Sequence, residues 1–357
     1  MTGLWLGFLG LAIISVTVFD VLSTTLSISG GGGPITARVA TGLWNLVLKQ
    51  HHSCRRDRQA SHRRLTKLGY GIALSPIVIW LGLIWMGWTL IFSATPEAVA
   101  NAETEVPADI WTRIYFTGYT LFTLGLGDYK PLGPFWQIVT AIAALNGFFF
   151  VTFSISYLIP VVSAATAQQQ LSSYISTLGK SADEIVVKAW NGKDFGALTQ
   201  HFIALTPMLT LHAQLYPAYP VVRFFHSDRR SYAAAPSIAA LDEALTLLEF
   251  GVKPECRPDA VALYPLRQAI SELIETLRFT FIEPGKQLPP SPSLHQLRKY
   301  GIPTISDQVF NLAVQDLAKR RQLLLTLVCH DGWCWDDVTA SEAIPYVRNP
   351  KVSPQGW

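Results

Sequence analysis

The chain has 357 residues, of which 50% are hydrophobic and only 15% are charged, and its mean hydropathy is +0.28. This balance is too apolar for an ordinary soluble protein of this length and indicates a membrane protein. The formal net charge of +3 is too small to indicate a nucleic-acid partner, and four cysteines are too few for a secreted disulfide framework. We therefore expect the cysteines to be reduced thiols.

Three apolar segments are long enough to cross a bilayer, which requires about 20 helical residues. They comprise residues 4–28, 68–92 and 135–162. The first has neither the basic region nor the cleavage site of a signal peptide, so we expect it to remain as a span. A shorter apolar segment, residues 110–122, cannot cross the bilayer and is expected to form a re-entrant half-helix with Asp109 as its N-cap.

The loops between these segments differ in charge. Residues 49–67 carry several Lys and Arg and a single acid, Asp57, whereas residues 94–109 carry acids and neither Lys nor Arg. Because basic loops stay on the cytoplasmic side, the protein is expected in the cell membrane with its N-terminus outside and its C-terminus in the cytoplasm. Residues 35–50 are expected to form an amphipathic helix on the inner membrane face.

The run Thr123-Leu124-Gly125-Leu126-Gly127-Asp128 lies between the re-entrant segment and the third span. Irregular backbone at membrane depth is tolerated only where protein buries it or where it lines a water-filled path. Alternating glycines allow successive peptide carbonyls to point to one side and replace the water shell of a cation. We expect the carbonyls to coordinate the ion, with the Thr123 hydroxyl at the inner end and the Asp128 carboxylate at the outer mouth.

This order of span, acidic loop, short helix, glycine run and span resembles the pore module of the potassium-channel superfamily over residues 68–162. The usual filter there reads Thr-Val-Gly-Tyr-Gly-Asp, and the present run is similar to the second pore segment of two-pore-domain potassium channels. The resemblance implies a potassium-selective channel with residues 123–128 as the selectivity filter and potassium as the permeant ion. Leu126 cannot donate the outward hydrogen bond of a filter Tyr, so a weakly selective cation channel is the alternative.

One filter copy per chain cannot close a ring of four, so we expect a homotetramer in the lipid bilayer. We expect no enzymatic activity and no cofactor, and the sequence does not indicate a ligand for the cytosolic part. The competing class is a non-conducting, membrane-anchored scaffold or signalling protein, in which the glycine run is only a tight turn.

Three further residues in the spans are candidates for gating. Gly147 lies where inner pore helices of the superfamily often bend, although a close helix contact explains a glycine equally well. Pro160 removes a helix hydrogen bond and predicts a kink. Asp20 is a charge at bilayer depth, which costs about 2.5–3.5 kcal/mol. It either serves gating or proton sensing or has a structural partner such as Arg38.

The sequence divides into three parts. Residues 1–67 hold the first span and the basic linker, residues 68–162 hold the pore, and residues 163–357 are long enough for a cytosolic domain. In the last part apolar residues recur at helical spacing, as at Ile270, Leu273, Ile274 and Leu277. The predicted fold class is an all-α membrane protein with three transmembrane helices, a re-entrant pore helix and filter, and a helical C-terminal domain.

The C-terminal part also contains cysteines and histidines. Cys256, Cys329, His330 and Cys334 form a metal site only if the fold joins them, and buried reduced cysteines are the simpler interpretation. We interpret His201, His212 and His226 as packing or surface residues, with pH sensing as the alternative.

Overall fold

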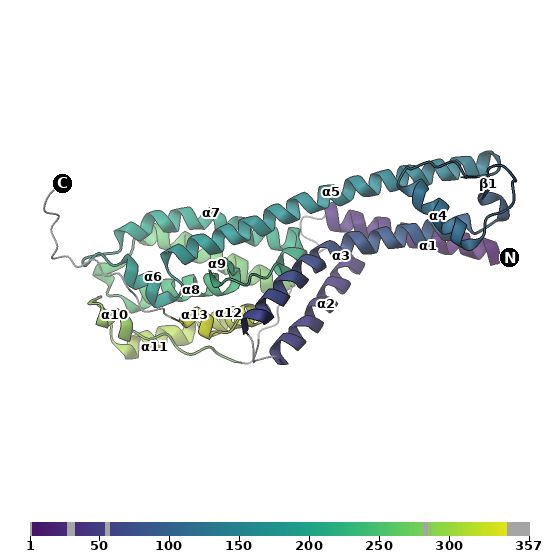
Figure 1. Ribbon diagram of the computed structural model, residues 1–357. Helices are drawn as coiled ribbons and strands as arrows, with labels where there is room; N and C mark the ends of the chain where they lie inside the picture. The colour runs from purple at the N-terminus through teal and green to yellow at the C-terminus, as the bar shows by residue number, and fades with distance from the viewer. Residues whose placement is uncertain (1, 27–32, 54–57, 281–284, 286, 341–357) are drawn as a thin grey trace, which may run out of the picture. The chain divides into compact units, whose positions relative to one another are not determined.

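The computed structural model describes residues 2–26, 33–53, 58–280, 285 and 287–340, and its regular elements are helices and one pair of two-residue antiparallel strands (Figure 1). Three helical segments, Gly3–Leu26, His62–Phe92 and Gly133–Leu178, are long and apolar enough to cross a membrane. The predicted fold class of an all-α membrane protein with a helical C-terminal region is therefore confirmed.

The chain forms two compact units. The first comprises Met1–Leu43 and Gly71–Val162, and the second comprises Trp44–Tyr70 and Ser163–Trp357. The basic linker therefore belongs to the same unit as the C-terminal domain. The helices and strands that contribute to the first unit are α1 (Thr2–Leu26), α2 (Pro34–Ser53), α3 (Arg58–Phe92), η1 (Pro96–Ala98), β1 (Ala100–Asn101), α4 (Ile110–Leu121), β2 (Tyr129–Lys130) and α5 (Gly133–Leu178).

Helix α5 is longer than the apolar segment that predicts it. It runs for 46 residues and contains Pro160 in its interior. The composition becomes polar after Val162, but no glycine or proline occurs between Pro160 and Gly179. The polar residues end the apolar stretch without ending the helix, which stops at Leu178, directly before Gly179.

The second unit is helical throughout its described part. Its elements after α5 are α6 (Ala182–Ala189), α7 (Gly196–Ala218), η2 (Pro220–Phe224), η3 (Arg230–Tyr232), α8 (Ala234–Thr246), η4 (Leu247–Gly251), η5 (Pro254–Cys256), α9 (Ala260–Thr280), α10 (His295–Lys299), α11 (Asp307–Asp316), α12 (Ala318–His330) and α13 (Asp336–Thr339). Every residue of α8 is buried, which makes this helix the centre of the unit. The predicted helical stripe at Ile270, Leu273, Ile274 and Leu277 lies on α9 and faces the same core.

Two acidic residues are buried with the apolar surface of α8. Oδ1 of Asp242 lies 2.6 Å from Nη2 of Arg320 and 3.3 Å from Nη1 of Arg267. Glu243 pairs with Arg321 at 2.6 Å. A helix buried on all sides can hold carboxylates only where cations and hydrogen bonds compensate them. These contacts therefore join α8 to α9 and α12.

The segment Trp44–Tyr70, which contains the end of α2, the basic linker and the start of α3, contributes apolar side chains to the second unit. Trp44 and Leu65 are each 1% exposed, and the ring of Trp44 lies 5.5 Å from that of Phe224. The indole Nε1 of Trp44 also donates to the carbonyl oxygen of His330 at 3.3 Å. The cytoplasmic linker expected from its charge is therefore partly a packed element.

Candidate ion-conduction site

The backbone of the glycine run alternates between two conformations. Thr123, Gly125 and Gly127 have φ values of +58°, +58° and +84°, whereas Leu124 and Leu126 are not among the residues with positive φ. When residues of positive and negative φ alternate, successive peptide units turn to the same side and their oxygens form one row. Thr123 takes this conformation although it carries a β-branched side chain, for which positive φ is rare.

Among the described residues, the carbonyl oxygens of this row accept none of the backbone hydrogen bonds of loops, turns and caps. Backbone donors anchor only the beginning of the run, where the N–H groups of Thr123 and Leu124 donate to Thr120 and Tyr119 at 3.1 and 2.8 Å. Within the described residues, no backbone hydrogen bond outside the helices and strands is accepted by residues 123–127. Since unsatisfied carbonyls at membrane depth are costly, this row requires water or a cation as its partner.

Helix α4 leads directly into the run. The Asp109 carboxylate accepts a hydrogen bond from the N–H of Thr112 at 2.8 Å, which confirms Asp109 as the N-cap. The helix ends at Leu121, two residues before Thr123. Its C-terminal end, which carries partial negative charge, therefore adjoins the carbonyl row and favours a cation there.

Two tyrosines of α4 hold the outer end of the run. The hydroxyl of Tyr119 donates to the carbonyl oxygen of Tyr129 at 2.8 Å, and the Tyr115 hydroxyl interacts with the side chain of Asp128. The carbonyl oxygen of Asp128 accepts from the N–H of Ala102 at 3.0 Å, beside the β1–β2 pairing. Sequence reasoning missed this brace, although two tyrosines four residues apart on a pore helix lie on one helix face.

Arg113, the single charge within the expected pore helix, organises the loop between α3 and α4. It is 8% exposed and its guanidinium donates to the carbonyl oxygens of Phe92, Thr95, Pro96 and Ala108, the Thr95 and Ala108 bonds each being 2.9 Å long. Phe92 is the last residue of α3, so Arg113 satisfies carbonyls that a helix end leaves without partners. The arginine therefore fixes the loop between α3 and α4 to α4.

The pore helix is held between α3 and α5. The indole of Trp85 donates to the carbonyl oxygen of Ile114 at 2.9 Å, and that of Trp88 donates to Oδ1 of Asn146 at 3.1 Å. Next to Asn146, Gly147 lies against the end of α4, where a Cβ would overlap the carbonyl oxygen of Leu121 and lie 2.7 Å from its carbon. Helix α5 is continuous at this position. The contact accounts for a glycine at 147 without a bend.

Replacing Gly147 with alanine is expected to push α5 away from the end of α4 and to destabilise the protein by about 1–3 kcal/mol, as overpacking does. The matched control is Gly82→Ala in α3, because a Cβ at Gly82 meets nothing within 4 Å. Thermal unfolding in detergent, followed by circular dichroism, measures both. Equal melting temperatures of the two variants would show that the close contact at Gly147 does not affect stability.

Asp20 is fully buried and bound by donors from two other helices. Its carboxylate accepts from the N–H of Ile35 at 2.7 Å, the hydroxyl of Thr36 at 2.6 Å and the indole of Trp80 at 2.7 Å. Arg38 is not its partner, because the Arg38 guanidinium donates to the carbonyl oxygen of Pro34 instead. Asp20 thus caps the N-terminus of α2 and joins it to α1 and α3.

The described cysteines of the C-terminal part belong to the second unit and lie in different elements of it. Cys256 belongs to η5, Cys329 to α12, and Cys334 follows α12. All three are free thiols, and no group of three or more His, Cys, Asp or Glu with metal-binding geometry occurs among the described residues. Cys54 lies outside the described residues.

Comparison with known proteins defines the class. Residues 78–164, which include the apolar half of α3, α4, the glycine run and most of the apolar part of α5, match the ion channel family model. The protein therefore carries an ion channel domain, the pore module of the potassium-channel superfamily. The chain is 34% identical over 342 residues to the uncharacterized membrane protein YdjJ of Bacillus subtilis (strain 168), covering 96% of this chain and 98% of that protein, and it belongs to the same family. No solved structure matches the chain.

Proposed function

We propose that the protein is a homotetrameric, potassium-selective channel of the cell membrane that conducts through the backbone carbonyls of residues 123–127. The observation that carries the proposal is the alternation of φ along Thr123, Gly125 and Gly127, which turns a row of carbonyl oxygens to one side, where no loop or cap hydrogen bond from the described part of the chain reaches them. Rings of such carbonyls replace the hydration shell of a potassium ion. The basic linker supports a cytoplasmic C-terminal domain, because basic loops stay on that side of the membrane.

The tetramer is proposed because one chain supplies one carbonyl row. The side chains of Leu124 and Leu126 are 65% and 57% exposed in the single chain. Helix α5 likewise exposes an apolar face that includes Ile138, Ile142, Leu145 and Phe149. Fourfold assembly around the carbonyl rows would cover leucines beside the filter, while lipid or neighbouring chains would cover the face of α5.

Selectivity for potassium depends on how firmly the carbonyl row is held. Leu126 supplies no hydrogen bond, which favours a weakly selective cation channel as the second candidate. The contacts of Tyr119 with Tyr129 and of Tyr115 with Asp128 favour strict selectivity, because they fix the outer end of the row to α4. These two contacts take over the bracing that Leu126 lacks.

The test is flux through liposomes that contain the purified protein, measured separately for potassium, sodium and a small anion. Potassium flux without sodium or anion flux supports the proposal. Equal potassium and sodium flux replaces it with the weakly selective channel. If neither the wild type nor variants designed to open the inner helices conduct cations, the channel proposal is replaced by that of a non-conducting, membrane-anchored scaffold.

Replacing Tyr119 with phenylalanine is expected to reduce the preference for potassium over sodium about fivefold, because one hydrogen bond worth about 1 kcal/mol no longer holds the outer end of the row. The ring still packs against Phe116 at 5.2 Å, so the fold is retained. Reversal potentials in planar bilayers measure the change. Tyr264→Phe, at a side chain of α9 that is 64% exposed, is the control and is expected to conduct as the wild type does.

A further inference from the structure

Two histidines from distant parts of the sequence meet inside the second unit. Nδ1 of His62, near the start of α3, lies 2.8 Å from Nε2 of His226, which follows η2. Their rings are stacked 5.0 Å apart, and Trp333 stacks on the His62 ring at 4.3 Å. Only 5% of His62 and 4% of His226 is exposed. The pair is therefore a buried contact between the first turns of α3 and the C-terminal domain.

Ionisable groups surround this pair on several sides. Asp331, which follows α12, places Oδ1 3.7 Å from Nδ1 of His226. Burial raises the pKa of Asp331 despite the opposing effect of His226, whereas burial and then the charge of Arg223 lower the pKa of His330. In a more exposed position next to His62 in sequence, Nε of Arg63 lies 3.9 Å from Oδ2 of Asp228.

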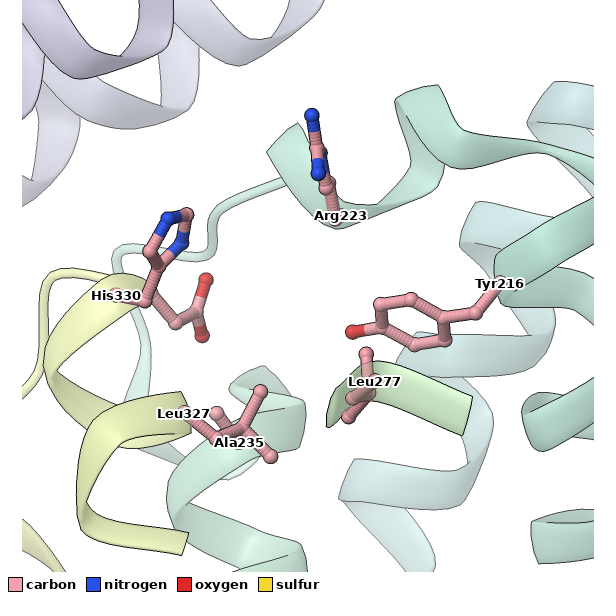
Figure 2. A pocket seen from close by; sticks show the side chains of 7 residues that line it. Tyr216, Arg223, Ala235, Leu277, Leu327 and His330 are labelled. Carbon is pink, nitrogen blue, oxygen red and sulfur yellow. The ribbon is translucent and has the colours of Figure 1, made fainter. Parts of the chain in front are cut away.

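A small cavity adjoins Asp331 on the side of α7. Figure 2 shows the hydroxyl of Tyr216, the guanidinium of Arg223 and the ring of His330 around it. Its volume is about 20 Å³, which is enough for about one water molecule. Ala235, Leu277 and Leu327 close it with apolar surface. The cavity can hold a water molecule beside the Asp331 carboxyl group and is too small for an organic ligand.

The protonation state decides whether the two imidazoles can stay in contact. A hydrogen bond between two ring nitrogens requires one N–H and one bare nitrogen, so the pair is stable when both rings are neutral or when one of them carries the extra proton. When both rings are protonated, two N–H groups face each other and two positive charges are in contact. Histidine is the side chain whose ordinary pKa lies between pH 5 and pH 8, so a contact between two histidines can respond to pH.

We propose that the His62–His226 pair is a proton-sensitive latch that holds the first turns of α3 on the C-terminal domain and releases them when both rings are protonated. Because α3 continues as one helix from Arg58 to Phe92, the latch acts on the helix that leads into the channel domain. An effect on conduction rests on the proposed function, whereas the release itself does not.

The test compares hydrogen exchange of the full chain in detergent micelles between the wild type and the double variant His62→Gln, His226→Gln, always at the same pH. Glutamine can keep an amide hydrogen bond but does not titrate. At pH 5.5 the peptides that cover residues 62–70 and 222–228 are expected to exchange about fivefold faster in the wild type than in the variant, the effect of one lost hydrogen bond. At pH 8 the two proteins are expected to exchange alike.

One control and one replacement variant make the result specific. His201→Gln, whose histidine contacts the hydroxyl of Tyr174 at 3.0 Å, is expected to keep the pH response of the wild type. If the double variant does not fold, His62→Gln alone serves, because it leaves one titrating ring and no second charge. Equal exchange of wild type and variant at pH 5.5 would overturn the latch. Since exchange requires no flux, a failure of channel activity leaves this test valid.

Discussion

Gly125→Ala is expected to abolish potassium flux while the protein still assembles. Gly125 has a φ of +58°, and an alanine in this region costs about 1–2 kcal/mol per chain. The backbone can relieve this cost by rotating one peptide, which turns a carbonyl oxygen away from the row. In a tetramer the change occurs in all four chains, so every ring of carbonyls that includes the rotated peptide is lost at once.

The matched control for this variant is Gly192→Ala. Gly192 has a φ of +97°, lies in a loop of the second unit and, like Gly125, has open space where a Cβ would be added. It introduces similar backbone strain away from the glycine run, so flux is expected to persist. Liposome flux together with size-exclusion chromatography measures conduction and assembly. A conducting Gly125→Ala variant would mean that ions do not pass along residues 123–127.

Asp242→Asn is expected to have the largest effect on stability. Asp242 is fully buried, and its carboxylate compensates two arginines of which only 10% and 16% of the side chain is exposed. Asparagine keeps the shape but removes the charge, which leaves Arg320 without its counter-ion and Arg267 with only Glu249, whose Oε2 lies 3.6 Å from Nε. Breaking a buried pair in this way costs about 3–5 kcal/mol. Chemical unfolding of the full chain in detergent, followed by circular dichroism, measures the loss.

The control is Asp307→Asn, which removes the carboxylate of an exposed pair with Arg298. Water solvates both charges there, so little change is expected. If Asp242→Asn is as stable as Asp307→Asn, the buried ion pairs of α8 do not stabilise the second unit.

The difference in stability between the wild type and Asp242→Asn is expected to change with pH in one direction. Burial alone raises the pKa of Asp242, but the charges of Arg267 and Arg320 outweigh it and the pKa is lowered below its usual value. A carboxyl group whose pKa is lower in the folded state stabilises the fold above its unfolded pKa, near 3.9, and loses this contribution as the pH falls through the folded value. The gap between wild type and Asp242→Asn is therefore expected to persist at pH 7 and to shrink only below about pH 4.

The sequence was sufficient to predict features that depend on local pattern. Long apolar segments predict the three spans, Asp109 before an apolar stretch predicts the N-cap of α4, and apolar spacing predicts α9. Each of these follows from residues within a few turns of one another. The position of the glycine run directly after a short helix could also be predicted, because it depends only on the order of segments along the chain.

Other features could not be predicted because they depend on which residues meet in space. Helical spacing does not reveal that Tyr119 reaches the carbonyl of Tyr129 or that Arg113 binds the last carbonyl of α3 and three carbonyls of the loop between α3 and α4. Charge suggested Arg38 as a partner for Asp20, but the donors are backbone and side-chain groups of α2 and an indole of α3. Likewise, a basic linker gives no sign that Trp44 and His62 are buried.

The donors of Asp20 also bear on how the protein enters the membrane during synthesis. Ile35 and Thr36 follow Asp20 by 15 and 16 residues, and Trp80 follows it by 60. When α1 first meets the lipid, its carboxyl group has none of these donors, which costs about 2.5–3.5 kcal/mol on the insertion scale. Stable residence of α1 therefore waits for α2 and then α3 to emerge from the ribosome. The spans α1 and α3, joined through Asp20 to α2, are therefore expected to settle together before the pore helix exists.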